Sequence, residues 1–187
     1  MEITLRRAVP EDAQHLLEIY THYIQHTVAT FHETPKTLEA YRQQIVDLSA
    51  VYPFWVAEAD GQFLGFANAE PFRPQSGYRY TVELTIYLHP DAPKHSGIGR
   101  MLYERLLEEL QQLSYVNALG CISGENEASL AFHRSFGFEE MAVFPKVAFK
   151  HGRWLDAVWM RKTLQPNAST PREPLRPDSS PIRADKK

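Results

Sequence analysis

The chain has 187 residues, a formal net charge of −3, and 43% hydrophobic and 12% aromatic residues. This length and composition predict one well-cored domain, and the charge gives no electrostatic footprint for nucleic acid. No apolar run is long enough to span a membrane, and the first residues, MEITLRRAVPED, lack the apolar core of a signal peptide. With a single cysteine, Cys121, these features lead us to expect a cytoplasmic protein without membrane or nucleic-acid partners.

The N-terminal third predicts a strand, two helices and a hairpin. Residues 3–8 (ITLRRA) are typical of a short strand, and Pro10 then opens a helix whose apolar residues recur at helical spacing. Thr37 is placed to cap a second helix over residues 38–48. Residues 54–69 predict two strands, because they contain an Asp-Gly pair, which is a strong signal for a tight turn.

The central part of the chain predicts a strand, a glycine loop and a long helix. Residues 80–88 alternate between apolar and polar side chains, and Pro90 ends this strand. The stretch KHSGIGRMLYERLLEELQQL, residues 94–113, then places two glycines ahead of leucines in helical register.

The C-terminal part predicts a strand around residues 119–122, a helix from Asn126 that Gly137 terminates, and two strands within residues 139–164. The predicted order is therefore β-α-α-β-β-β-α-β-α-β-β. Such an order indicates an α/β (α+β) domain with a mixed, mostly antiparallel twisted sheet flanked by helices. Parallel pairing is needed only where a helix intervenes.

The composition changes sharply after Leu164. Residues 165–187 (QPNASTPREPLRPDSSPIRADKK) are rich in proline and poor in apolar side chains, so burial cannot offset the entropy of ordering them. We therefore expect one folded domain over residues 1–164 and a disordered tail over residues 165–187.

Gly97 and Gly99 stand directly before the long helix, although glycine lowers helix stability. Two interpretations are open: an ordinary loop, or a nest of backbone N–H groups that holds an anion at the positive end of the helix. The loop is not a Walker A motif, because no Lys-Ser or Lys-Thr follows Gly99. It is not a dinucleotide fingerprint either, because Leu102 stands where a third glycine is required.

Two blocks of sequence carry a resemblance to the GCN5-related N-acetyltransferases, the GNAT superfamily. Residues 94–99 (KHSGIG) match that family's pyrophosphate loop, Gln/Arg-x-x-Gly-x-Gly/Ala, except at the first residue. Residues 126–138 (NEASLAFHRSFGF) are similar to the family's helix that runs from Asn to Gly-Phe and flanks coenzyme A.

Three further stretches narrow the resemblance to the phosphinothricin and methionine sulfoximine acetyltransferase branch. They are TVATFHETPKT (27–37), PFRPQSGYRYTVELTIYLHP (71–90) and KHGRWLDAVWM (150–160). The resemblance covers roughly residues 3–164. It implies a GNAT fold, acetyl-CoA as the acetyl donor, a small-molecule amine as the acceptor, and a homodimer with the substrate loop near the interface.

The resemblance implies that the backbone amides of the glycine loop hold the pyrophosphate of acetyl-CoA. The implied cofactor contacts in this loop are Lys94, His95, Ser96, Gly97, Ile98, Gly99 and Arg100. Lys94 replaces the family's Gln or Arg, but an ammonium still meets a phosphate as a point charge.

Four further positions are implied in binding the donor. Backbone N–H groups around Ile86, Tyr87 and Leu88 would polarise the thioester carbonyl. Asn126 would hydrogen-bond the cofactor, and its alternative role is that of a helix cap.

Two residues are implied in catalysis. Glu83 occupies the position of the proposed general base, and acts either directly or through one water; its alternative is an ordinary solvated glutamate. His133 stands where relatives carry an acid for the leaving thiolate, and its alternative is a histidine packed between helix and sheet.

Five residues are expected to bind the acceptor: Phe31, Arg73, Tyr78, Arg79 and Tyr80. Guanidinium groups with aromatic walls suit an amine that carries a carboxylate, although scattered surface residues and core packing are the alternatives. Gln75 stands near a position where phosphinothricin acetyltransferases often have a basic residue, which favours a methionine sulfoximine-like acceptor.

We therefore predict an acetyl-CoA-dependent N-acetyltransferase of small amino-acid-like amines. The alternatives are a protein or peptide Nα-acetyltransferase, and a non-catalytic acyl-CoA sensor that keeps the fold. No metal is expected, because no cluster of His, Cys and Asp has metal-ligand spacing, and Cys121 is expected to be a small buried side chain.

Overall fold

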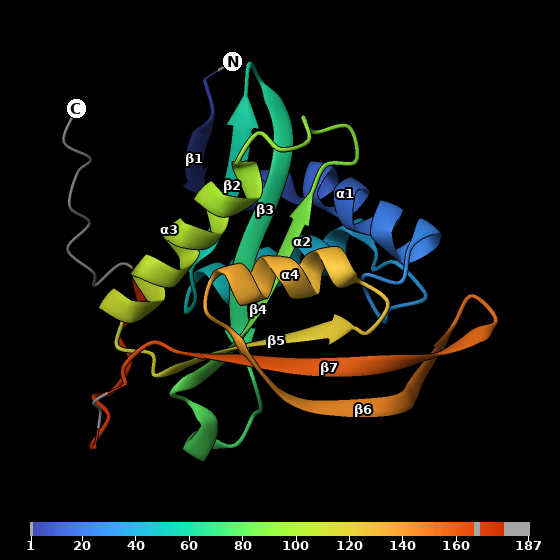
Figure 1. Cartoon of the computed structure of the whole chain (residues 1–187). Coiled ribbons are helices and arrows are strands. Elements are labelled where there is room, and N and C mark those ends of the chain that lie inside the picture. Colours follow the sequence, from blue (N-terminus) through green and yellow to red (C-terminus); the bar gives the residue numbers. More distant parts are fainter. Residues whose placement is uncertain (1, 167–168, 178–187) are drawn as a thin grey trace.

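The chain folds around one seven-stranded sheet with helices on both faces (Figure 1). The computed structural model describes residues 2–166 and 169–177. The strands follow one another across the sheet in the order β1-β2-β3-β4-β5-β7-β6. The elements are β1 (Thr4–Arg7), α1 (Ala13–His26), α2 (Leu38–Ser49), β2 (Phe54–Ala59), β3 (Gln62–Pro71), β4 (Thr81–Leu88), α3 (Ile98–Gln112), β5 (Asn117–Ser123), α4 (Glu127–Ser135), β6 (Glu139–Lys150) and β7 (Arg153–Thr163).

The predicted element order and the mixed, mostly antiparallel sheet are confirmed. Neighbouring strands pair antiparallel except β4 and β5, which are parallel and are connected through α3. Thr37 caps α2 as expected, because its hydroxyl accepts a hydrogen bond from the Ala40 N–H at 3.2 Å. Asp60 and Gly61 both have positive φ, 51° and 76°, which is the backbone of a tight hairpin turn.

The start of the first helix differs from the prediction. Pro10 opens a single 3₁₀ turn, η1 (Pro10–Asp12), and α1 begins only at Ala13. Asp12 accepts hydrogen bonds from the Val9 N–H at 2.9 Å and from the Arg6 guanidinium at 2.7 Å. The contact with Arg6 joins this turn to β1, and the turn ends where α1 begins.

Two hydrophobic cores cover the two faces of the sheet. On one face α3 packs Leu102 and Leu106, both fully buried, against the central strands. On the other face α1 and α2 pack Leu16 and Ile45 around Phe66. Among the described residues, no helix is both long and apolar enough to cross a membrane.

The sheet opens between β4 and β5. β4 pairs with β3 as far as Leu88, which lies opposite Gly65. Its pairing with β5 stops at Glu83, which lies opposite Leu119, whereas β5 continues beside β7 to Ser123. Beyond Glu83 the C-terminal half of β4 therefore has β3 on one side and a gap on the other.

The described part of the predicted tail, residues 165–166 and 169–177, contains no α-helix or strand. It nevertheless contacts the domain: the Leu175 N–H donates to the Leu113 carbonyl at 2.9 Å, and Glu173 forms an ion pair with Arg79 at 2.8 Å. Residues 167–168 and 178–187, for which disorder is also predicted, lie outside the described residues. The domain boundary at Leu164 stays a prediction.

Candidate active site

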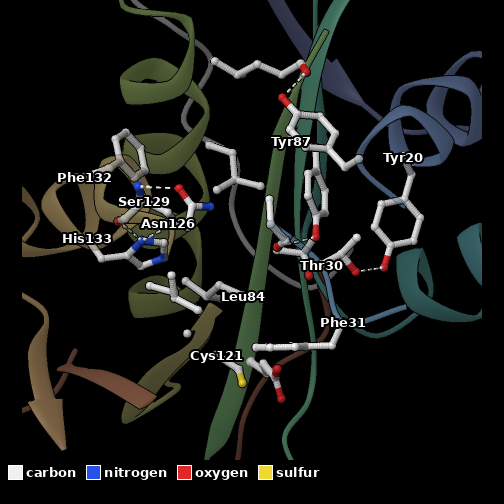
Figure 2. A pocket seen from close by; sticks show the side chains of 18 of the residues that line it. Tyr20, Thr30, Phe31, Leu84, Tyr87, Cys121, Asn126, Ser129, Phe132 and His133 are labelled. Carbon is white, nitrogen blue, oxygen red and sulfur yellow. Dashed lines mark hydrogen bonds between the residues drawn. The ribbon is translucent and has the colours of Figure 1, made fainter. Parts of the chain in front are cut away.

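A cavity of about 540 Å³ occupies the gap between β4 and β5. Figure 2 shows α4 on one side of β4, and Tyr20, Thr30 and Phe31 on the other. The predicted site residues that line the cavity are Phe31, Glu83, Ile86, Tyr87, Leu88, Gly99, Asn126 and His133.

β4 divides this cavity, because side chains of a strand alternate between the two faces of the sheet. Ile86 and Leu88 pack against the core under α3, whereas Tyr87 packs against the core under α1 and α2. Alternation places Glu83 on the Tyr87 side. One strand therefore separates a half of the cavity near α3 and α4 from a half near α1 and α2.

The backbone of β4 also presents donors to the gap. The His89 N–H donates to the Leu64 carbonyl of β3 at 2.8 Å. Because successive N–H groups of a strand point in opposite directions, those of Ile86 and Leu88 point away from β3 and toward the gap. The Leu88 carbonyl points the same way, since it accepts a 2.8 Å hydrogen bond from the Tyr23 hydroxyl. Two N–H groups in this position can stabilise an oxyanion.

The glycine loop has left-handed backbone at two positions just before α3. His95 and Gly97 adopt positive φ, 58° and 81°, and Gly97 is the N-cap of α3. A Cβ on Gly99 would lie 3.5 Å from Leu88 and 3.6 Å from Phe132, which both line the cavity. Any side chain larger than a methyl group at this position would therefore project into the cavity. Free N–H groups at a helix N-terminus, with a bare backbone beside them, suit the pyrophosphate of acetyl-CoA.

The other predicted loop residues do not line the cavity. They are Lys94, His95, Ser96, Gly97, Ile98 and Arg100. The Ile98 side chain is buried in the core, the Ser96 hydroxyl donates to the Pro93 carbonyl at 2.6 Å, and Arg100 pairs with Glu104 at 3.1 Å. The Ile98, Ser96 and Arg100 side chains are therefore engaged within the protein, whereas Lys94 and His95 are exposed.

Asn126 lies where it can serve both predicted roles. Its Oδ1 accepts a hydrogen bond from the Ser129 N–H at 3.1 Å, which caps α4. Its side chain also lines the cavity, and the amide nitrogen points into it (Figure 2). The cap fixes the amide, which leaves its N–H₂ group directed into the cavity.

Glu83 is half-buried at the end of the β4–β5 pairing and faces a second carboxylate. Glu70 on β3 is its direct cross-strand partner, and both line the cavity. Burial raises the pKa of Glu83 to about 7, the Glu70 charge adds to the increase, and the Arg73 guanidinium opposes it. A carboxylate with this pKa can accept a proton near neutral pH.

Glu70 is not among the site residues that the sequence predicts. Its pairing with Glu83 depends on the register of β3 against β4, which the connection over residues 72–80 sets. A connection of this length carries no register signal like the Asp-Gly turn that joins β2 to β3.

His133 is buried among aromatic rings, 3% exposed, with Tyr103, Phe132 and Phe138 around it. Its Nδ1 lies 2.8 Å from the Ser129 carbonyl, so Nδ1 carries the proton that this bond requires. Burial lowers the pKa of the imidazole. These contacts favour a neutral, packed histidine, while the predicted acid role is untested.

Tyrosine side chains shape the half of the cavity near α1 and α2, and the sequence did not single them out there. The Tyr20 hydroxyl lies 2.9 Å from both the Thr30 hydroxyl and Nδ1 of His32, and its ring packs against Tyr87. Phe31 lies in the same wall (Figure 2), and its role in binding the acceptor stays a prediction. Apolar residues at helical spacing indicated only that Tyr20 faces the core.

The predicted acceptor residues of the loop before β4 are Arg73, Tyr78, Arg79 and Tyr80, and none of them lines the cavity. Arg73 stacks on the Phe72 ring at 4.6 Å and is close enough to Glu83 to oppose its pKa increase. Arg79 instead pairs with Glu173 at 2.8 Å and donates to the Tyr80 hydroxyl. Arg73 is therefore the nearer candidate for an acceptor carboxylate.

Cys121 lines the cavity as a protonated thiol. Burial raises its pKa to about 12, and the nearby Glu83 charge contributes. Across the described ranges, no group of three or more His, Cys, Asp or Glu side chains is arranged to hold a metal ion.

The site thus combines the N-terminus of α3 on one side of an opened sheet with a carboxylate of raised pKa on the other. Comparisons with known proteins identify the family to which the chain belongs. Residues 5–159 match the family model "Acetyltransferase (GNAT) domain". The chain thus belongs to the GNAT acetyltransferase family, whose members use acetyl-CoA.

Several relatives are similar over nearly the whole chain. An L-methionine sulfoximine/L-methionine sulfone acetyltransferase of Salmonella typhimurium is 35% identical, over 89% of this chain and 98% of its own length. A phosphinothricin N-acetyltransferase of Alcaligenes faecalis is 34% identical, over 89% and 85%. The crystal structure of a phosphinothricin acetyltransferase from Sinorhizobium meliloti with AcCoA superposes with a TM-score of 0.88 at 36% identity, over 96% of this chain and 98% of that one.

Proposed function

We propose that this enzyme transfers the acetyl group of acetyl-CoA to the amine of a small amino-acid-like acceptor. The observation that carries the proposal is the cavity through the sheet, which has Glu83 on one side of β4 and the N-terminus of α3 on the other. Donor and acceptor bound on opposite sides of β4 would meet at the gap between β4 and β5.

Glu83 is the proposed base in this reaction. It takes one proton from the acceptor ammonium, directly or through one water, and the free amine then bonds to the thioester carbonyl carbon. The N–H groups of Ile86 and Leu88 donate to the oxyanion that forms. When the carbon–sulfur bond breaks, the proton shed by the attacking nitrogen neutralises the leaving thiolate. His133 could relay this proton only through Nε2, since Nδ1 is held by Ser129.

For the acceptor we propose a zwitterionic amino acid, with Arg73 as the partner of its α-carboxylate. The names of the relatives support this class. The aromatic walls of the cavity suit a small side chain. With Gln75 in place of a basic residue, methionine sulfoximine should be a better acceptor than phosphinothricin, whose phosphinate would also meet Glu70 and Glu83.

A panel of amino acids, decarboxylated amines and a peptide amine with acetyl-CoA, followed by thiol release, tests the proposal. We expect the highest kcat/KM with free amino acids. Preference for the peptide would indicate an Nα-acetyltransferase of proteins, and binding of acetyl-CoA without turnover on any amine would indicate a sensor.

We also propose that two copies associate through the β6–β7 hairpin. β6 is an edge strand, and large apolar side chains of the hairpin are exposed. They are Met141, Val143, Phe144, Val147, Phe149 and Trp154. Such a patch on a sheet edge fits a partner surface. Light scattering should give a dimer that Phe149→Glu dissociates. Val46→Glu, at an exposed apolar position on α2, should leave the dimer intact.

A further inference from the structure

Glu70 is a carboxylate that the mechanism above does not use. It stands opposite Glu83 on the neighbouring strand, and side chains of such pairs are about 5 Å apart at Cβ. Both are half-buried and line the part of the cavity that Tyr20 and Tyr87 also line. Among the described residues, neither carboxylate has a hydrogen-bond or ion-pair partner.

No lysine or arginine among the described residues lines this cavity. The nearest cations act from outside it. Lys36 opposes the increase in the pKa of Glu70, but its ammonium donates to Gln44 at 2.7 Å. Arg73 acts on Glu83 in the same way while it stacks on Phe72.

The other titratable groups that face the pair are neutral near pH 7. Burial raises the pKa of Tyr20 and Tyr87, so both phenols keep their protons. Burial and the charges of Lys36 and Lys150 lower the pKa of His32, and burial raises that of Cys121. Among the side chains that line this half of the cavity, the charge is therefore set by the two glutamates. Lys150, a buried ammonium that does not itself line the cavity, donates to the Thr30 carbonyl at 2.8 Å.

One base is enough to deprotonate one amine, and a second carboxylate beside it costs repulsion unless a proton or a cation neutralises the pair. Resting on the acetyl transfer proposed above, we infer that Glu70 makes the enzyme select acceptors that carry a second ammonium group, such as basic diamino acids. Glu83 takes the proton of the reacting amine, and Glu70 accepts a charge-assisted hydrogen bond from the other ammonium. The ring of Tyr20, packed against that of Tyr87, gives the methylene chain an apolar wall and favours a cation near its face.

The test compares L-lysine with L-norleucine, which has the same aliphatic chain without the second amine. In the wild-type enzyme kcat/KM should be about 10- to 100-fold higher for lysine, the range expected of a hydrogen bond to a charged group. On the high-pH plateau of activity, Glu70→Gln should bring kcat/KM for lysine down to the level of norleucine and change kcat/KM for norleucine less than about threefold. Glu39→Gln removes the same charge from an exposed position on α2 and should preserve the preference.

Equal wild-type rates for lysine and norleucine would overturn the inference and leave acetyl transfer intact. An equal loss of kcat/KM for lysine and norleucine in Glu70→Gln would also overturn the inference, because Glu70 would then act only through Glu83. Absence of thiol release with every acceptor would instead overturn the proposed function itself.

Discussion

The two halves of the cavity on either side of β4 present different chemical groups. The half near α3 and α4 presents backbone N–H groups, bare glycine backbone and the amide of Asn126. The half near α1 and α2 presents tyrosine rings and the carboxylates of Glu70 and Glu83. Backbone donors suit a donor molecule of fixed structure, whereas side chains can change with the acceptor. Acceptor specificity should therefore depend on side chains that leave the donor site untouched.

The largest effect is expected at the base. Glu83→Gln keeps the size of the side chain and removes its basicity, so turnover should fall by roughly 10²- to 10⁴-fold at neutral pH. Affinity for acetyl-CoA, measured by calorimetry, should hold, because Glu83 lies on the acceptor side of β4. Near-normal turnover of the mutant would place the base elsewhere, and loss of acetyl-CoA binding would contradict the separation of the two halves.

Substitution in the glycine loop should act on the other half alone. Gly99→Val would fill space beside Leu88 and Phe132 and should weaken acetyl-CoA binding by about 100-fold, as expected when 2–3 kcal/mol of binding is lost. Gly97→Val should act similarly through its positive φ of 81°. Gly77→Val is the matched control, because a Cβ there meets nothing within 4 Å and φ is not positive. Equal weakening by all three would argue against a nest.

A smaller effect is expected from Arg73→Lys. Lysine keeps the charge but loses the bidentate geometry, so kcat/KM for an amino acid should fall by about 10-fold. The decarboxylated amine should lose much less. Arg42→Lys, an exposed position on α2, serves as the control. If kcat/KM falls equally for the amino acid and the decarboxylated amine, Arg73 acts on Glu83 and does not hold the acceptor carboxylate.

The smallest effect concerns pH. As the proposed base, Glu83 must be ionised to act. The kcat/KM for an acceptor with a neutral side chain should therefore fall as the pH drops through about 7. Glu70→Gln removes one of the two causes of the raised pKa of Glu83, so the acidic limb of the pH profile should move to lower pH. The kcat/KM near pH 6 should then rise a few-fold relative to its high-pH plateau. The test is a pH profile with norleucine. A limb that does not move would mean that burial alone sets the pKa of Glu83.

Local chemistry encoded the elements of this protein. Alternation of side chains predicted β4, the hydroxyl of Thr37 predicted the start of α2, and Asp60-Gly61 predicted the β2–β3 turn, because each signal acts within a few residues of chain. Gly97 and Gly99 by themselves left open an ordinary loop or an anion nest, and only the resemblance to the GNAT superfamily favoured the nest.

Only the tertiary structure decided which side chains line the two halves of the cavity. The end of β4–β5 pairing at Glu83 opens the sheet, and the β3–β4 register brings Glu70 opposite Glu83. The pairing of Arg79 with Glu173 joins segments far apart in sequence and turns a predicted acceptor residue toward the C-terminal segment. Register and long-range ion pairs depend on how distant segments meet in space, and no local pattern of residues encodes that meeting.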